Sequence, residues 1–177
     1  SIELLKNASY LDFPIKPIFS FSSKYKTLLQ QYQLTKDITE EEIPIPTCSQ
    51  AFYWNDVLIY LTNSLIINNE EKKTDIQIMS IALKGNTMFV IDNLLKVYKT
   101  ELPRIDFIEL TFIYPTIKIE TNEEMAAFLS ISGACFFEDG TSILGQYVDI
   151  AIGKTKLFTL DEYGEIQIVS LKDKTIT

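Results

Sequence analysis

Apolar and polar residues alternate most regularly near the C-terminal end of the chain. Short runs with a period of two residues are separated there by the turn sequences Asp139-Gly140, Gly153-Lys154 and Tyr163-Gly164. A two-residue period between turns is typical of antiparallel strands that bury one face. Residues 134–171 are therefore predicted to form an antiparallel β-meander.

Two segments in the first half have apolar residues at the spacing of a helical face. Ser22 or Ser23 is expected to cap a helix that ends near Gln33. The pattern over 49–67 favours a second helix, because the helical spacing persists over three turns. Residues 58–62 also have the composition of a strand, so the strand remains an alternative there.

Two further helices are predicted in the middle of the chain. Apolar residues keep a helical spacing over 87–102 until Pro103 ends the segment. The alternative is a hairpin, which is less favoured because Asp92-Asn93 is its only turn candidate and no glycine lies between the two arms. Thr121 and Glu124 have the spacing of a capping box, which predicts a short helix that buries Met125, Phe128 and Leu129.

The remaining segments are predicted to be extended or looped. Pro14 and Pro17 make residues 1–21 an extended arm, because proline disrupts both helices and central strands. Residues 36–47 are expected to form a loop and residues 68–73 a turn. Strands are predicted over 76–83, 105–113 and 116–120. These elements predict a single α+β domain over 1–177, with mainly antiparallel sheet, about four helices and the C-terminal β-meander, and no internal repeat is recognisable.

Charge and composition narrow the range of partners. The 177 residues include 16 Lys and Arg against 24 Asp and Glu, for a formal net charge of −8. Nucleic-acid binding depends on Lys and Arg, and Arg104 is the only arginine, so no nucleic-acid partner is expected. No apolar run approaches the ~18–20 residues of a membrane span, and no signal peptide is recognisable. A cytoplasmic location without a membrane partner is therefore expected.

The chain contains no histidine, which excludes Ser-His-Asp and Cys-His catalysis and histidine-rich zinc sites. Cys48 and Cys135 lie far apart and cannot form a four-thiolate zinc site. They are expected to be free thiols in a reducing compartment, with a single disulfide as the alternative. Neither a metal nor a cofactor is expected.

Carboxylates are the remaining chemical resource, and their pairs fall mainly at predicted turns and at a helix start, where acids are ordinarily solvated. Catalysis by carboxylates with Mg²⁺ is therefore less favoured, and the protein is predicted not to be an enzyme. Gly153-Lys154-Thr155 matches the end of a phosphate-binding loop, but Val148 stands where that motif needs a glycine. A simple turn is predicted instead.

Aromatic residues indicate where a partner could bind. Phe52, Tyr53 and Trp54 are consecutive, so they cannot all face inward on either a helix or a strand. Tyr and Trp are enriched at the energetic centres of protein interfaces. Tyr53 and Trp54, together with Glu40, Glu41 and Glu42, are therefore the candidate partner-binding residues.

The order of three segments, 81–85, 88–92 and 123–129, together with Val97-Tyr98, resembles that of the SUKH domains. This resemblance covers about a third of the chain and implies an acidic α+β module, a class that includes many bacterial immunity proteins. The chain departs from the family where a glycine-containing turn is expected, because Asn93-Leu94-Leu95-Lys96 stands there.

These observations favour a non-catalytic protein-binding module. An acidic inhibitor or immunity-type protein that acts on a basic partner is the favoured form, because a negative field speeds encounter with such a partner. A structural subunit of a stable complex is the alternative, followed by a Mg²⁺-dependent hydrolase. The sequence leaves the partner and the oligomeric state undetermined.

Overall fold

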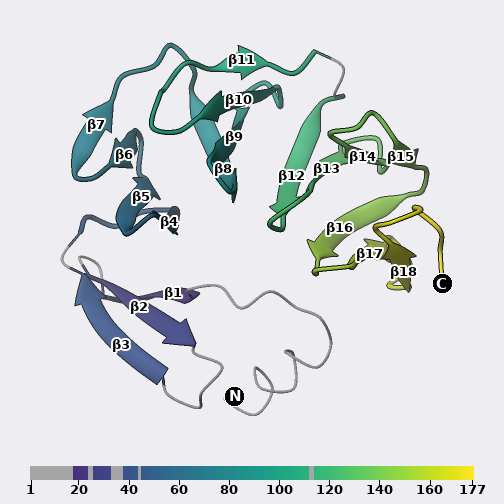
Figure 1. The fold of residues 1–177 in the computed structure, drawn as a ribbon, viewed down its shortest axis with the longest axis horizontal. Coiled ribbons are helices and arrows are strands. Elements are labelled where there is room, and N and C mark those ends of the chain that lie inside the picture. The colour runs from purple at the N-terminus through teal and green to yellow at the C-terminus, as the bar shows by residue number, and fades with distance from the viewer. Residues whose placement is uncertain (1–17, 24–25, 33–37, 44, 112–113) are drawn as a thin grey trace. The chain divides into compact units, whose positions relative to one another are not determined.

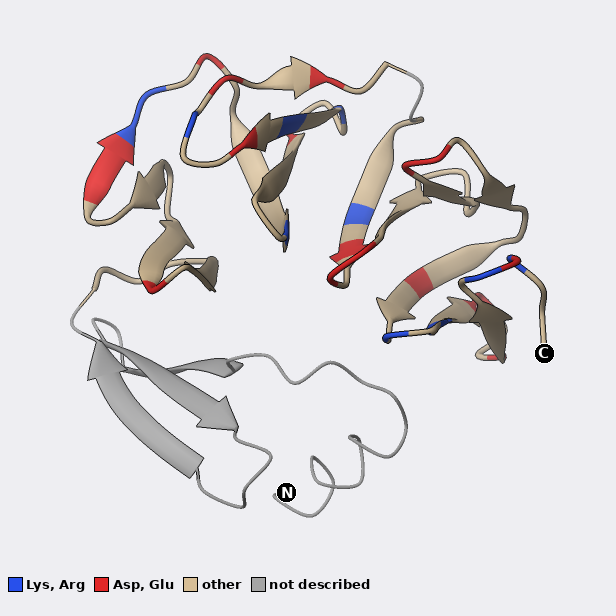
Figure 2. Ribbon diagram, viewed as in Figure 1, with Lys and Arg blue, Asp and Glu red and all other residues tan. Residues whose placement is uncertain are grey.

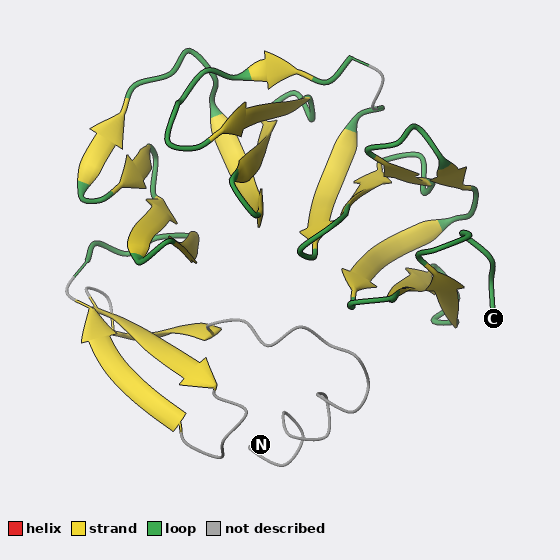
Figure 3. Cartoon of the chain, viewed as in Figure 1, coloured by secondary structure: helices red, strands yellow, loops and turns green. Residues whose placement is uncertain are grey.

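The computed structural model describes the chain apart from residues 1–17, 24–25, 33–37, 44 and 112–113, with side chains from Ile45 onward. Every regular element in that part is a β-strand, and Figure 3 shows strands and loops without a helix. No helix long and apolar enough to span a membrane is therefore found among the described residues. The predicted α+β class with about four helices is wrong, because the described chain is all-β.

The 18 strands of the described residues form five antiparallel sheets in which consecutive strands are neighbours (Figure 1). The first sheet contains β1 (Ile18–Ser23), β2 (Lys26–Tyr32) and β3 (Ile38–Ile43). The second contains β4 (Gln50–Trp54), β5 (Val57–Leu61), β6 (Leu65–Ile67) and β7 (Glu70–Lys72). The chain divides into two compact units, 1–75 and 76–177, and these two sheets belong to the first unit.

The second unit contains three sheets, which we call the first, second and third repeat sheets. The first contains β8 (Ile78–Lys84), β9 (Thr87–Asp92), β10 (Val97–Glu101) and β11 (Ile108–Glu109). The second contains β12 (Thr116–Thr121), β13 (Ala126–Ser130), β14 (Cys135–Phe137) and β15 (Ser142–Ile143). The third contains β16 (Tyr147–Ile152), β17 (Lys156–Asp161) and β18 (Ile166–Ser170).

Two predicted helices of the first unit are replaced by strands. The segment that follows Ser23 contains β2, and residues 49–67 contain β4, β5 and β6. Asn55 and Asp56 join β4 to β5 with φ values of 45° and 61°, as a two-residue hairpin turn requires. Asn and Asp tolerate this left-handed backbone, so the strand alternative had a local signal. The predicted loop over 36–47 contains β3.

The predicted helix over 87–102 is the β9–β10 hairpin. Strand β9 is buried on both faces, which removes the two-residue period and leaves a continuous apolar run. Leu95 takes the turn position that requires positive φ, at 63°, so the expected glycine is absent. The structure therefore contradicts the α+β fold that the SUKH resemblance implied.

The predicted helix after Thr121 is also a hairpin. Asn122 Oδ1 accepts hydrogen bonds from the backbone N–H groups of Glu124 (2.9 Å) and Met125 (2.7 Å). A helix N-cap makes the same type of bond, but here Asn122 N–H donates to the Met125 carbonyl and the chain turns back into β13. Phe128 and Leu129 are buried as expected, on a strand.

The predicted strands at 76–83 and 116–120 correspond to β8 and β12, whereas the described part of 105–113 contains only the two-residue β11. Within 134–171, strands β14 to β18 pair antiparallel with their neighbours in the second and third repeat sheets.

The repeat sheets share one register, so the structure repeats although no repeat is recognisable in the sequence. The first residue of each first strand pairs with the last residue of the second strand, 14 positions later: Ile78 with Asp92, Thr116 with Ser130, and Tyr147 with Asp161. A β-bulge follows that pair in all three sheets and leaves one residue unpaired: Met79, Ile117 or Val148.

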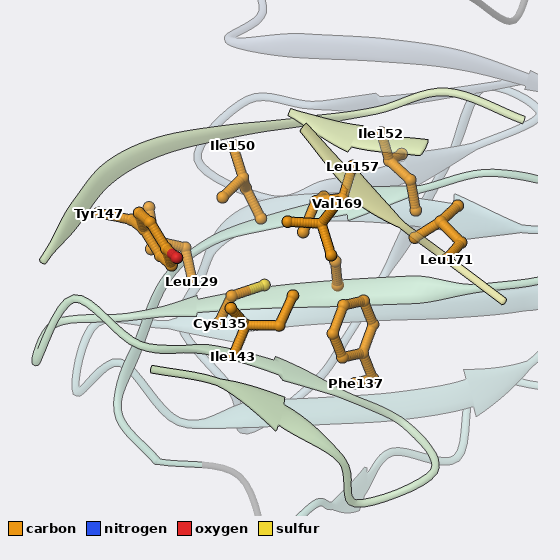
Figure 4. Packing of buried hydrophobic residues seen from close by; sticks show 11 residues of the cluster. Leu129, Cys135, Phe137, Ile143, Tyr147, Ile150, Ile152, Leu157, Val169 and Leu171 are labelled. Atoms are coloured by element: carbon orange, nitrogen blue, oxygen red, sulfur yellow. The ribbon is translucent and has the colours of Figure 1, made fainter. Parts of the chain in front are cut away.

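Apolar clusters join consecutive repeat sheets. Ala82, Phe89 and Val97 of the first sheet cluster with Ala126 and Phe128 of the second, and the rings of Phe89 and Phe128 meet edge to face at 5.5 Å. A larger cluster joins the second and third sheets (Figure 4); its members include Leu129, Cys135, Phe137, Ile150, Leu157 and Val169. The core of this unit therefore lies between the faces of neighbouring sheets.

Polar contacts also join the sheets. The Thr121 hydroxyl donates to the Leu83 carbonyl, and the Asn122 amide Nδ2 donates to the Gly153 carbonyl at 2.9 Å. Lys84 forms a part-buried ion pair with Glu138 across the first and second sheets. These contacts fix each sheet to the next.

Candidate protein-binding surface

In each repeat sheet the chain reverses direction between the second and third strands through a five-residue turn of the same type. These turns are Asp92–Lys96, Ser130–Ala134 and Asp161–Glu165. The N–H of the first residue donates to the carbonyl of the fifth, at 3.0, 2.8 and 3.0 Å. The fourth residue has positive φ in every copy: Leu95 at 63°, Gly133 at 89° and Gly164 at 83°. This is the three-residue hairpin loop that ends in a left-handed residue.

The side chain of the first turn residue stabilises the turn. Asp92 Oδ1 accepts from the N–H groups of Leu94 (2.9 Å) and Lys96 (2.8 Å). Asp161 Oδ1 accepts from Tyr163 and Glu165 in the same way, each at 2.9 Å. The residues in the middle of these turns therefore stand on a fixed backbone.

The chain enters the next sheet at the same end. Thr116 N–H donates to the Leu95 carbonyl at 2.9 Å, and Tyr147 N–H donates to the Gly133 carbonyl at 3.0 Å. The bulges lie at this end too, because each follows the residue paired with the start of the turn. We call this region the turn end; it comprises the three turns, the linkers 114–115 and 144–146, and the three bulge residues.

The turn end concentrates exposed apolar side chains. Eight of the eleven large apolar residues that are exposed in the described part of 76–177 lie there, with 45 to 82% of their surface accessible. They are Met79, Leu94, Tyr114, Ile117, Ile131, Leu144, Val148 and Tyr163. A concentration of exposed apolar residues on one end of a folded unit is typical of a protein interaction site.

The Lys118 ammonium has three oxygen partners beside the turn end. It contacts Asp149 Oδ1 (2.5 Å), the Ile150 carbonyl (3.0 Å) and Glu120 Oε1 (3.4 Å), and so joins β12 to β16. Figure 2 shows the basic part of β12 in blue and the acidic part of β16 in red. Partial burial opposes the charge of Lys118, but the hydrogen bond to Asp149 and the nearby Glu120 raise its pKa. The same hydrogen bond lowers the pKa of Asp149. Lys118 therefore joins the first strands of the second and third repeat sheets next to their bulge residues, Ile117 and Val148.

The residues proposed from sequence lie in the first unit. Tyr53 and Trp54 end β4, and of the three consecutive aromatics Tyr53 is the most exposed, at 36%. Glu40, Glu41 and Glu42 lie on β3, whose side chains fall outside those described. Their role in partner binding stays a prediction.

The described side chains form no cluster of metal-ligating groups. No group of three or more Cys, Asp and Glu residues within them could hold a metal ion. Cys48 and Cys135 are buried and form no disulfide, and burial raises the pKa of the Cys135 thiol to about 12. Gly153-Lys154-Thr155 is the turn between β16 and β17, with Gly153 N–H donating to the Lys156 carbonyl.

Comparison with known proteins identifies the fold. No protein-family model and no curated protein matches the sequence. Among solved structures, human WBSCR16 matches with a TM-score of 0.62 at 11% identity, over 89% of this chain and 64% of its own. The N-terminal domain of Nup159 matches at 0.58 and 9% identity, and BBS1N in complex with ARL6DN at 0.59 and 11%. These two comparisons cover 93% and 92% of this chain, and 59% and 64% of the solved chains.

The chain has a β-propeller-type fold. Its repeat sheets are the blades of that fold: antiparallel sheets that follow one another along the chain and pack face against face. The first strands β8, β12 and β16 are in contact from one sheet to the next. At these identities the likeness concerns the fold alone, and the chain spans about three fifths of the length of the solved chains.

Proposed function

We propose that the protein is a non-catalytic protein-binding module whose turn end binds another protein. The observation that carries this proposal is the turn end itself: three equivalent turns and bulges expose apolar side chains on a backbone held by hydrogen bonds. Preordered apolar residues lose little conformational entropy on binding, which favours affinity.

The solved neighbours support the same class of function. BBS1N was solved in complex with ARL6DN, and Nup159 was solved bound to Dbp5. Both proteins have a fold of this type, and both were solved in complex with another protein. The described residues of the present chain offer a surface of the kind such binding uses.

Replacing three turn-tip residues is expected to abolish partner capture. The variant L94S/I131S/Y163S removes one apolar tip from each turn and leaves the turn hydrogen bonds in place, because those bonds use backbone atoms and Asp92, Ser130 and Asp161. The control I108S/I176S changes two exposed isoleucines, at 62 and 57%, that lie away from the turn end. Affinity capture from the native cell with quantitative mass spectrometry should show proteins that wild type and control retain and the turn-tip variant loses.

Retention of the same proteins by all three chains would contradict the role of the turn end. Circular dichroism and thermal unfolding of each variant show whether it is folded. A folded variant that loses partner capture has lost the binding surface rather than the fold.

The finer part of the proposal is that the partner is basic. The net charge of −8 would attract such a partner over long distances, and Glu40 to Glu42 are the densest acidic run. The variant E40Q/E41Q/E42Q is expected to slow association several-fold at low ionic strength, with little change at high salt. Stopped-flow association rates at two salt concentrations test this, and unchanged rates at low salt would exclude the electrostatic claim.

A further inference from the structure

The charged residues of the turn end are concentrated in one of its three turns. The first turn contains one acid and one base, Asp92 and Lys96, and the second turn contains no charged residue. The third turn contains three acids, Asp161, Glu162 and Glu165, and no base. The two linkers and the three bulge residues are uncharged. The turn end is therefore apolar over its first and second turns and acidic at its third.

The charges of the first turn already have partners within the unit. Asp92 is 5% exposed, and its carboxylate accepts from two backbone N–H groups of its own turn. The Lys96 ammonium forms an ion pair with Glu109 at 3.2 Å. Glu162 and Glu165 are exposed, and neither forms an ion pair with another described residue. The acidic side chains that a partner can pair with therefore lie in the third turn.

The three turns follow one another in a row. One apolar cluster joins the first repeat sheet to the second, and another joins the second to the third. The first turn accepts a hydrogen bond from Thr116 of the second sheet, and the second turn accepts one from Tyr147 of the third sheet. The second turn is therefore linked to both of its neighbours. A partner segment that crosses the row meets two apolar turns and then the acidic one.

Tyr163 brings the acids of the third turn into any contact that is made there. Its side chain is 82% exposed, and it stands next to Glu162 and two residues before Glu165. A partner that covers Tyr163 removes water from around the neighbouring carboxylates, which costs free energy unless a positive group takes its place. An Arg guanidinium can pair with a carboxylate and also stack on a tyrosine ring. The third turn therefore favours a basic group in the partner.

We infer that the turn end binds a partner segment in one orientation, with apolar side chains on the first two turns and Arg or Lys on the third. This inference rests on the proposed function and adds the chemistry of the partner at each turn. Leu94 and Ile131 make the apolar contacts, and Glu162 and Glu165 make the charged ones. These contacts are short-ranged, whereas the long-range attraction proposed above involves Glu40 to Glu42.

Selection from a phage-displayed library of random linear peptides tests this inference, with the purified full chain as bait. Peptides selected by wild type are expected to combine apolar residues with Arg or Lys at one end. E162K/E165K should select Asp or Glu at that end, because it reverses the charge of the third turn. Such a selection also shows that this variant is folded. The control E123K/E124K makes the same change at exposed positions of the opposite end of the sheets, and it should select the same basic peptides as wild type.

The affinity of one selected basic peptide, made synthetically, gives the size of the effect. E162K/E165K should raise its dissociation constant at least ~10-fold at physiological ionic strength. E123K/E124K should leave the constant nearly unchanged, because a six-residue strand such as β12 spans about 20 Å and salt screens charges beyond about 8 Å. Selected peptides without a charge preference would overturn the inference, as would equal effects of the two double variants or the absence of any enriched peptide.

Failure of this inference is distinguishable from failure of the proposed function. The turn-tip variant L94S/I131S/Y163S removes an apolar contact from every turn. Peptides that lose affinity for this variant but keep it for E162K/E165K would contradict the charged contact and still support binding at the turn end. Peptides that bind the turn-tip variant as tightly as wild type would contradict both.

Discussion

Asn122→Ala is expected to lower the free energy of unfolding by about 3 kcal/mol. The Asn122 side chain is buried and has four hydrogen-bond partners: it accepts from Glu124 and Met125 N–H, and it donates to the carbonyls of Gly153 (2.9 Å) and Lys154 (3.3 Å). Alanine removes all four bonds and leaves buried backbone groups without a partner, at about 1–3 kcal/mol for each unsatisfied group. Urea unfolding followed by circular dichroism measures the loss.

Two further variants divide this effect. Asn122→Asp keeps an oxygen that accepts from Glu124 and Met125 N–H but cannot donate to the Gly153 and Lys154 carbonyls. Its loss of unfolding free energy should therefore measure the contribution of the bonds between the second and third repeat sheets. Asp173→Ala removes an exposed carboxylate that accepts from Thr175 and Ser170, both in its own turn. It should cost about 1 kcal/mol or less. Equal losses for Asn122→Ala and Asp173→Ala would show that Asn122 does not join the second and third repeat sheets.

Gly133→Ala is expected to lower the free energy of unfolding by about 3 kcal/mol. Gly133 has a φ of 89°, which a residue with a Cβ rarely adopts. A Cβ there would lie 2.9 Å from Gln146 Cα and 3.0 Å from the Gly145 carbonyl oxygen, both backbone atoms of the linker. The linker must therefore shift, and such overpacking typically costs about 1–3 kcal/mol beyond the conformational cost.

Gly164→Ala is the matched control for Gly133→Ala. Gly164 holds the equivalent turn position with a φ of 83°, but no atom lies within 4 Å of an added Cβ. Its substitution should therefore cost only the conformational part, about 1 kcal/mol. If both alanine variants lose the same stability, the linker 144–146 does not pack on the second turn as described.

The strands that the sequence predicted correctly are those with one buried face, because their apolar and polar residues alternate. Strand β16 is buried on one face, so its apolar residues keep the period of two. Strand β9 is buried on both faces and lost that period, which made 87–102 look helical. Whether a strand has one covered face or two depends on the neighbouring sheet, and no local pattern contains that information.

The repeat was not recognisable because its copies share geometry rather than residue types. The first turn residue is Asp92, Ser130 or Asp161, and the fourth is Leu95, Gly133 or Gly164. The 14-position register is conserved in the structure among the three sheets, but the side chains at each position differ in size and polarity. The bulges moreover shift the alternation by one residue in the first strand.

The turn end was missed for a related reason. Tyr163 is next to Gly164, and Ile131 lies two residues before Gly133, so a turn glycine marks each of them as close to an exposed turn. Leu94 has no glycine near it, and the sequence pattern does not distinguish the bulge residues Met79, Ile117 and Val148 from ordinary strand residues. Only the pairing of distant strands shows that these residues share one end of the unit. The sequence did show that Phe52, Tyr53 and Trp54 cannot all face inward, and Tyr53 is the exposed one.

Hydrogen exchange of the chain with and without its captured partner tests the central claim most directly. The account predicts slower exchange on binding at turn-end amides, over 93–95, 131–133 and 162–164, and in the linker 144–146. The turns at the other end of the same sheets, 85–86, 122–125 and 153–155, should exchange at unchanged rates. Protection confined to those opposite turns, or to the first unit, would contradict binding through the turn end.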